Sequence, residues 1–154
     1  MNTPIGVLEI DACLEGIQGI SFIDDSDEVS SNPPELHVTK EARDQLNEYF
    51  NGRLLKFDLP LKYKGSEFQQ AVWEEMSNVQ YGRTISNLDL ARKFGDARVV
   101  RSISSGLNKN PLPIIIPCHR IVNSKGKPTS YRWGMFRKKF LIELEHPFKQ
   151  GVLF

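Results

Sequence analysis

The sequence predicts an α/β chain in two parts, a small acidic unit of strands and a helix followed by a basic, mainly helical unit. Three observations predict this fold class. Apolar residues alternate with polar ones over residues 5–22, apolar residues recur at helical spacing after residue 66, and the sign of the charge changes near residue 60. We therefore expect one domain over residues 1–63 and a second over residues 64–154.

The composition is that of a globular protein. The 154 residues are 40% hydrophobic and 25% charged, which is enough to bury a core. No apolar run approaches the ~20 residues of a membrane span, and the first residues lack the basic and apolar regions of a signal peptide. Two cysteines make no disulfide framework. We therefore expect a cytoplasmic protein and exclude membrane, collagen-like and disulfide-scaffold classes.

The net charge of +1 conceals an uneven distribution. Residues 1–60 contain 4 Lys and Arg against 12 Asp and Glu, which leaves 16 basic and 7 acidic side chains for residues 61–154. Two solvated surfaces that differ by chance are one explanation. A separation this large more often means that one half faces a polyanion.

The acidic part is predicted to be a small α/β unit. Its alternating residues form two strands joined by a turn within residues 15–19, and residues 24–34 form an acidic, Ser-rich loop. Thr39 is expected to cap a helix that runs to about Phe50. Alternation over residues 55–61 predicts a further strand, which a proline restricts to the sheet edge.

The basic part is predicted to contain a helix-turn-helix. A first helix begins with capping-box spacing at residues 66–69. Ser86 is expected to cap a short helix over residues 87–94, and Asp96 a second one over residues 97–107. Two short helices joined by a Gly-containing turn are typical of this motif, although any corner between two helices looks similar.

The second of these helices carries unusually small side chains. Arg101 is followed by Ser102, Ser104, Ser105 and Gly106. Such a surface lets a helix backbone approach a partner closely, and its hydroxyls can bond phosphate oxygens. Packing of the same small residues against the core is an equally good explanation.

Cys118 is the candidate nucleophile. It follows the apolar residues 114–116, which predict a short buried strand, and it precedes His119 and Arg120. Positive neighbours lower the pKa of a thiol, whereas burial raises it, so a partner base is needed. The cysteines and histidines have no zinc-site spacing, and a packed core cysteine is the other alternative. We expect a thiolate assisted by His119 through water, with Glu143 or Glu145 orienting the imidazole.

Four segments resemble motifs of the O6-alkylguanine-DNA alkyltransferases. Residues 110–122, Asn-Pro-Leu-Pro-Ile-Ile-Ile-Pro-Cys-His-Arg-Ile-Val, resemble the family's active-site signature. Residues 66–73 resemble its Phe-Gln…Val-Trp helix, residues 81–86 its Gly…Ser entry into the helix-turn-helix, and residues 138–145 its closing Lys…Leu-Leu…Glu helix. The resemblance implies a ribonuclease-H-like N-terminal domain and a mainly helical C-terminal domain with a winged helix-turn-helix.

The resemblance also implies an activity. Such a protein transfers an alkyl group from O6 of a guanine in double-stranded DNA to its own cysteine, here Cys118, irreversibly and once per molecule. The guanine must first leave the base stack. By position, His119 takes the thiol proton through water, Glu145 orients His119, and Asn110 holds the active-site turn. We expect a monomer that needs no metal or organic cofactor, and we do not predict the zinc that some relatives carry.

Contacts to DNA and to the damaged base follow by position in the family's motifs. The recognition helix enters the minor groove, and Arg101 fills the gap left by the extruded guanine. The predicted DNA-binding residues are Arg101, Ser102, Ser105, Gly106 and Asn87. The predicted alkylguanine pocket is lined by Tyr131, Pro113, Ile121, Arg132 and Trp133, and the main-chain carbonyls of Cys118 and Ile121 accept from the guanine amino group.

Two positions depart from the family's pattern. Asn87 stands where a tyrosine is usual, and asparagine can also donate to the base but is shorter and lacks the aromatic face. Arg132 and Trp133 stand where a small residue and glycine are usual. We expect Trp133 to occupy pocket volume, which predicts efficient methyl transfer and weak reaction with O6-benzylguanine.

Two other functions compete with repair. A non-catalytic sensor of alkylated DNA would flip the base without repairing it, but that branch of the family lacks the cysteine. A winged-helix regulator would use residues 82–107 for sequence-specific binding, and its Pro-Cys-His-Arg run would be incidental.

Overall fold

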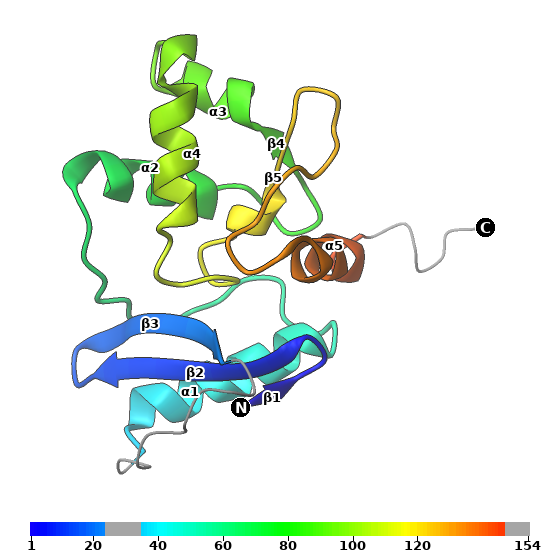
Figure 1. Cartoon of the computed structure of the whole chain (residues 1–154). Coiled ribbons are helices and arrows are strands. Elements are labelled where there is room, and N and C mark those ends of the chain that lie inside the picture. Colours follow the sequence, from blue (N-terminus) through cyan, green and yellow to red (C-terminus); the bar gives the residue numbers. More distant parts are fainter. Residues whose placement is uncertain (24–34, 147–154) are drawn as a thin grey trace. The chain divides into compact units, whose positions relative to one another are not determined.

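A computed structural model describes residues 1–23 and 35–146, and the chain divides into two compact units, Met1–Lys64 and Gly65–Phe154. The first unit is a small sheet with a helix, and the second is mainly helical (Figure 1). The predicted mixed α/β fold class is therefore confirmed. The loop predicted over residues 24–34 lies outside the described residues. No described helix has both the length and the apolar character needed to cross a membrane.

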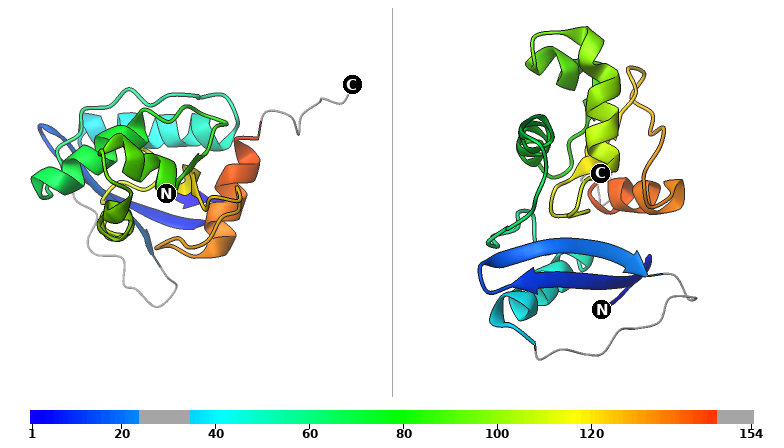
Figure 2. Two further views of the ribbon diagram at one scale, coloured as in Figure 1. Left: turned by 90° about the horizontal axis from the view of Figure 1, so that it is seen from above. Right: turned by 60° about the vertical axis from the view of Figure 1, so that its left-hand side comes forward.

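The first unit contains a three-stranded antiparallel sheet in the order β1-β2-β3, with a helix packed against it (Figures 1 and 2). Its elements are β1 (Asn2–Thr3), β2 (Gly6–Cys13), β3 (Gly16–Ile23) and α1 (His37–Phe50). Leu8 pairs with Phe22 and both are buried, whereas Glu9 pairs with Ser21 and both are exposed. The alternation in the sequence thus gives the sheet one buried and one exposed face.

The helix of the first unit begins earlier than predicted. Its N-cap is Leu36, which makes no side-chain cap hydrogen bond, and Thr39 lies inside the helix. The prediction that Thr39 caps the helix was therefore wrong. The helix has an apolar face toward the core, because Ala42, Leu46 and Tyr49 are buried.

The strand predicted over residues 55–61 is not formed. Leu61 makes an isolated parallel bridge with Ile17, and the Ile17 N–H donates to the Pro60 carbonyl over 2.8 Å. The physical reason is that Pro60 has no N–H to extend the ladder and Leu55 is 62% exposed, so the alternation buries no face. The chain passes so close to Gly16 that an added Cβ would lie 2.7 Å from the Pro60 oxygen.

The second unit contains the predicted helix-turn-helix in α3 and α4 (Figure 1). Its elements are α2 (Glu67–Ser77), β4 (Ile85–Ser86), α3 (Asn87–Lys93), the 3-10 turn η1 (Ala97–Val99), α4 (Val100–Asn108), the 3-10 turn η2 (Cys118–Arg120), β5 (Ile121–Val122) and α5 (Met135–Leu144). The single helix predicted over residues 97–107 is thus a 3-10 turn followed by an α-helix.

Capping residues start these helices as predicted. Ser66 and Gln69 form a full capping box at α2, Ser86 accepts from the Asp89 N–H at α3, and Asp96 accepts from the Arg98 N–H at η1. Tight packing then joins α2 to α4, because the buried Trp73 indole N–H donates to the Gly106 carbonyl over 2.9 Å. This contact fixes the helix that leads into the candidate site.

Candidate active site

Asn110 holds the turn that carries Cys118. Its side-chain Nδ2 donates to the Ile116 carbonyl over 2.8 Å, and its Oδ1 accepts from the Leu112 N–H over 2.8 Å. The same Nδ2 lies 3.1 Å from the Cys118 Sγ. Asn110 is buried, so each of its contacts is made in a region that water does not screen.

The apolar run before Cys118 is a turn, and the prediction of a short strand over residues 114–116 was wrong. Ile114 has a φ of 77°, in the left-handed region that a β-branched residue rarely adopts. A single bridge joins Pro113 to Ile116. Burial of Ile114 and Ile116, together with the bonds to Asn110, offsets the cost of this backbone conformation. The strained backbone of this turn sets the position of Cys118. An apolar run in the sequence does not by itself predict that strain.

A buried array of charged and polar side chains lies beside Cys118. The His119 Nε2 is 2.7 Å from the Glu145 Oε2, and Glu145 is the residue that ends α5. Arg120 donates from Nε and Nη2 to the two Glu145 oxygens over 2.8 and 3.0 Å. Arg120 also donates to the Val79 carbonyl. The array brings together residues 26 positions apart in the sequence, and it selects Glu145 over Glu143 as the carboxylate.

The environment of this array fixes its protonation. Burial alone raises the pKa of Glu145, but hydrogen bonds and charges from His119 and Arg120 lower it to about 2. Burial lowers the pKa of His119, against the opposing effect of Glu145. A neutral His119 that donates its Nε2 proton to Glu145 presents Nδ1 as an acceptor. That Nδ1 is buried and has no hydrogen-bond partner among the described residues.

Cys118 is protonated at neutral pH in this environment. Burial raises the pKa of its thiol to about 12, although the Asn110 hydrogen bond and the charge of Lys138 both lower it. The thiolate is the nucleophilic form, so the site needs a base that removes the proton. His119 is the neighbouring group with an open acceptor nitrogen.

Cys118 opens into a pocket formed by several segments of the second unit. The pocket is lined by Asn87, Ser104, Leu107, Asn108, Cys118, Ile121, Val122, Thr129, Ser130, Tyr131 and Arg132. Parallel pairing of β4 with β5 places Asn87 there, because Ser86 lies opposite Val122. Of the predicted site residues, Asn87, Ile121, Tyr131 and Arg132 line this pocket with Cys118.

Two predicted lining residues lie outside this set. Pro113 is buried in the turn, and Trp133 lies beneath Arg132, whose guanidinium carbon is 4.7 Å from the indole ring centroid. The prediction that Trp133 occupies the pocket is therefore corrected, because Arg132 lines the pocket and Trp133 does not. The direction of each side chain in this loop decides which residue lines the pocket, and no periodic pattern in the sequence predicts that direction.

Tyr131 gives the pocket an unusual polar group. Its hydroxyl is buried and has no hydrogen-bond partner in residues 1–23 and 35–146. Burial and the neighbouring Cys118 raise its pKa, so it stays protonated. A buried hydroxyl without a partner is costly unless a ligand or water satisfies it.

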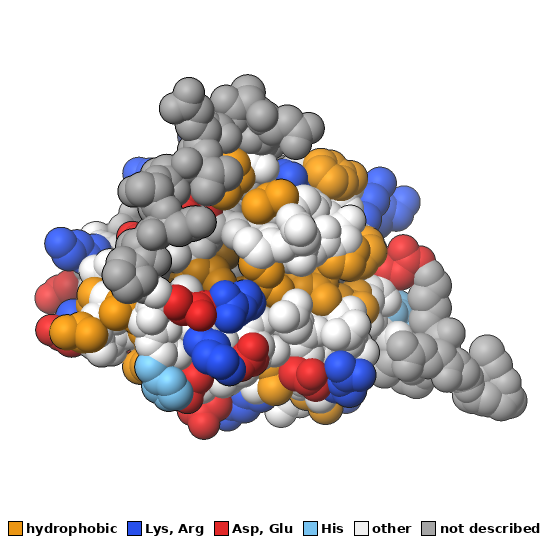
Figure 3. Space-filling model, turned by 90° about the horizontal axis from the view of Figure 1, so that it is seen from below, with side chains coloured by type: hydrophobic (Ala, Val, Ile, Leu, Met, Phe, Trp, Pro, Cys, Tyr) orange, Lys and Arg blue, Asp and Glu red, His pale blue; other side chains and the backbone are white. Residues whose placement is uncertain are grey.

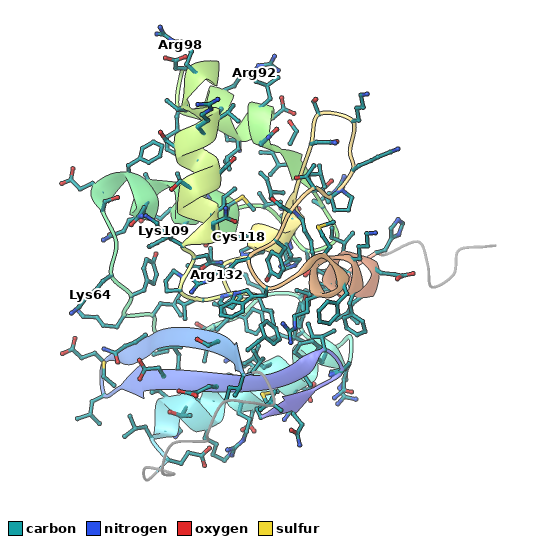
Figure 4. The ribbon with its side chains drawn as sticks, in the orientation of Figure 1. Lys64, Arg92, Arg98, Lys109, Cys118 and Arg132 are labelled. Carbon is teal, nitrogen blue, oxygen red and sulfur yellow. The ribbon has the colours of Figure 1, made fainter. Side chains whose placement is uncertain are left out.

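The exposed face of α4 adjoins the pocket. Arg101, Ser102, Ser105 and Asn108 are exposed, and Asn108 also lines the pocket. Gly106 lies on the opposite, buried face, where an added Cβ would contact Val72 of α2 at 3.9 Å. Because Gly106 is buried on the side of α4 that packs against α2, the prediction that it belongs to the exposed DNA-binding surface was wrong. At the far end of the helix-turn-helix, Arg92 and Arg98 project from the chain (Figure 4).

Sequence reasoning did not assign roles to two buried cations. Arg120 was seen only as a neighbour of Cys118, and Lys138 only as the first residue of the last helix. Amphipathic spacing was the available signal for Lys138, because it lies three residues before the buried Leu141. Within residues 1–23 and 35–146, no group of three or more His, Cys, Asp or Glu side chains could hold a metal ion.

Comparisons with protein families match both parts of the chain. The model described as "6-O-methylguanine DNA methyltransferase, DNA binding domain" matches residues 67–147. The model described as "6-O-methylguanine DNA methyltransferase, ribonuclease-like domain" matches residues 1–63.

Individual relatives are similar over nearly the whole chain. A methylated-DNA–protein-cysteine methyltransferase of Methanosarcina barkeri is 34% identical over 94% of each chain. The protein of that name from Mycobacterium tuberculosis is 35% identical over 94% of this chain and 89% of its own. The crystal structure of the O6-methylguanine methyltransferase of M. tuberculosis has a TM-score of 0.85 at 31% identity, covering 100% of this chain and 93% of that chain. A crystal structure of the M. tuberculosis protein in complex with DNA has a TM-score of 0.85 at 34% identity, covering 95% and 90%.

Proposed function

Because the chain belongs to the 6-O-methylguanine DNA methyltransferase family, we propose that it repairs DNA by moving the methyl group from O6 of guanine to Cys118. The observation that carries this proposal is the environment of the thiol. Cys118 is a buried pocket residue with an amide 3.1 Å from its sulfur and a 2.7 Å His119–Glu145 pair beside it. A thiol with a histidine–carboxylate pair beside it is the arrangement typical of an activated cysteine nucleophile.

The reaction needs one proton transfer and one displacement. His119 Nδ1 takes the Cys118 proton through a bridging water, and Glu145 stabilises the imidazolium that forms. The thiolate attacks the methyl carbon, a sulfur–carbon bond forms, and the bond from that carbon to guanine O6 breaks. The electron pair of the broken bond leaves on the guanine, which takes up a proton and becomes ordinary guanine. No step regenerates the thiol, so each molecule reacts once.

The target base reaches Cys118 by leaving the duplex, which costs a few kcal/mol. The exposed face of α4 fits the role of approaching the minor groove, because Ser102 and Ser105 are small and Arg101 is long enough to enter the base stack. The unpartnered hydroxyl of Tyr131 and the side chain of Asn87 then offer hydrogen bonds to the extruded guanine. Contacts with phosphates make the binding salt-dependent.

We propose that residues 64–154 bind DNA and accept the alkyl group, and that residues 1–63 form the ribonuclease-H-like domain. Every group of the site comes from one chain, so the reaction needs no second copy, and we propose a monomer in the cytoplasm. The nucleophile and proton path are protein groups, so EDTA should leave the reaction rate unchanged.

A labelled substrate tests the proposal. Duplex DNA that carries O6-[methyl-³H]methylguanine is incubated with the wild-type protein, with Cys118→Ala and with Cys13→Ala. Label should appear on the wild-type and Cys13→Ala proteins, one methyl per molecule at most, and not on Cys118→Ala.

Other outcomes would overturn repair in favour of a specific rival. Tight binding of the methylated duplex without label on the wild-type protein would indicate a damage sensor. Equal binding of methylated and unmethylated duplexes, again without label, would indicate a regulator.

A further inference from the structure

Lys138 is a fully buried cation that the mechanism above does not use. It lies in the first turns of α5 with 0% of its surface exposed. Its Nζ donates to the Ser130 carbonyl over 2.9 Å. Burying an ammonium group is costly unless it is bonded and faces a compensating charge.

Ser130 connects Lys138 to the pocket. Ser130 and Tyr131 are consecutive residues of the loop before α5, and both line the pocket with Cys118. The hydrogen bond to the Ser130 carbonyl therefore ties the wall of the pocket to α5. The same helix ends at Glu145, so one element holds both the wall and the carboxylate of the buried array.

Lys138 is also in electrostatic reach of the nucleophile. Its charge lowers the pKa of the Cys118 thiol, and an ionised Cys118 in turn raises the pKa of Lys138. Burial lowers the pKa of Lys138 to about 8, so it is mostly charged at neutral pH. The other titratable or charged groups around the site are His119 and Arg120 of η2, Glu145 and Arg137 of α5, Tyr131 and Arg132 of the loop, and Tyr81.

The other charged groups around Cys118 do not neutralise Lys138. Glu145 is already paired with His119 and Arg120, so the Arg120 charge is compensated locally. Tyr131 is neutral. When Cys118 is ionised, the imidazolium of His119 faces Glu145, and Lys138 is a further buried cation whose charge lowers the pKa of the thiol.

We propose that Lys138 is a positioning residue for methyl transfer, whose ammonium group stabilises the Cys118 thiolate while its bond to Ser130 holds the pocket wall in place. This inference rests on the proposed function for its biological meaning, but the coupling between Lys138 and Cys118 can be measured separately. Neutral Lys138 variants should need a higher pH to ionise Cys118.

The pH dependence of Cys118 alkylation by iodoacetamide reports that coupling without DNA. Lys138→Gln keeps an N–H donor for the Ser130 carbonyl but removes the charge, whereas Lys138→Arg keeps the charge. We expect Lys138→Gln to shift the midpoint upward by at least one pH unit, so that alkylation at pH 7.5 is about tenfold slower. Lys138→Arg should keep a midpoint closer to that of the wild-type protein. Lys139→Met, at an exposed neighbouring position, should match the wild type.

Methyl transfer from the labelled duplex is measured on the same proteins, with circular dichroism as the check on folding. Lys138→Gln should transfer methyl more slowly at pH 7.5 and regain rate at higher pH, which a merely structural defect would not do. An unshifted Lys138→Gln midpoint, or an equal upward shift in Lys138→Arg, would overturn the inference. If Lys138→Gln does not fold, an upward shift in Lys138→Arg overturns it alone. A wild-type protein that takes no label would refute the proposed function but leave the iodoacetamide comparison valid.

Discussion

Both units carry ion pairs on the surface, such as Arg98–Asp96 in the second unit, but among the described residues only the second unit buries charged side chains. In the first unit, ion pairs lie on the surface, and acidic and basic side chains are neighbours on the face shown in Figure 3. These pairs include Lys40–Asp44, Arg43–Glu35 and Arg53–Glu48. In the second unit, His119, Arg120, Lys138 and Glu145 are all at most 7% exposed.

This difference separates exposed ion pairs from buried charged groups that can act on the reaction at Cys118. Exposed pairs are screened by solvent and contribute little to stability. A buried pair is costly to form and is often no more stable than apolar residues of the same size, so stability alone does not explain the array around Glu145. The position of this array beside Cys118 explains it, because a low dielectric strengthens each interaction with a charge that develops during the reaction.

Removing Glu145 should produce the largest loss of stability. Glu145→Gln leaves the buried Arg120 guanidinium without its counter-charge, which we expect to cost about 3–5 kcal/mol of the free energy of unfolding. Urea denaturation measures this loss. Glu143→Gln, at an exposed position of the same helix, should cost far less. Equal losses in the two variants would contradict the special status of the buried array.

The buried imidazole should make stability fall in mild acid. Burial lowers the pKa of His119 in the folded protein, so the unfolded chain binds a proton below pH ~6.5 that the folded chain resists. Stability is therefore fully present above that pH and is lost as the pH falls, by at most about 2 kcal/mol between pH 7 and 5.

Thermal unfolding at pH 7 and pH 5 checks this prediction. His119→Gln should lose most of the pH-dependent drop, whereas His37→Gln, whose side chain is 85% exposed, should keep it. A melting temperature that does not change between these pH values would show that His119 is protonated in the folded protein.

The sequence predicted what local patterns determine and missed what long-range packing determines. The capping box at Ser66 and the burial of Val72, Trp73 and Met76 follow from spacing within one helix. By contrast, the strand predicted around Leu55 fails because nothing buries its alternate residues.

The candidate site divides in the same way. Cys118 and Asn110 were predicted from the motif, and the contacts of Asn110 with Leu112, Ile116 and Cys118 lie within that short segment. The left-handed Ile114 and the place of Lys138 depend on contacts between segments, and a single sequence does not record those contacts.

Arg132 is an exposed, charged residue of the second unit, and its removal should change which substrates react. It lines the pocket, and its Nη1 lies 3.5 Å from the Asn110 carbonyl oxygen. Arg132→Ala should open the wall and raise the rate with O6-benzylguanine by about tenfold, with a smaller change for O6-methylguanine in DNA. Trp133→Gly should have a weaker effect, because Trp133 acts through Arg132. A larger effect of Trp133→Gly would restore the sequence-based assignment of that residue to the pocket.

The smallest effect should come from an ion pair of the first unit. Lys40 and Asp44 lie 2.7 Å apart one helical turn from each other, and both side chains are more than half exposed. The pair lowers the pKa of Asp44, but solvent screens the interaction, so Asp44→Asn should leave both urea denaturation and methyl transfer unchanged within error. A clear loss of stability in this variant would mean that exposure does not separate the two kinds of charge. An unchanged Asp44→Asn protein beside a destabilised Glu145→Gln protein would show that burial, rather than the short distance common to both pairs, sets the cost of removing one partner.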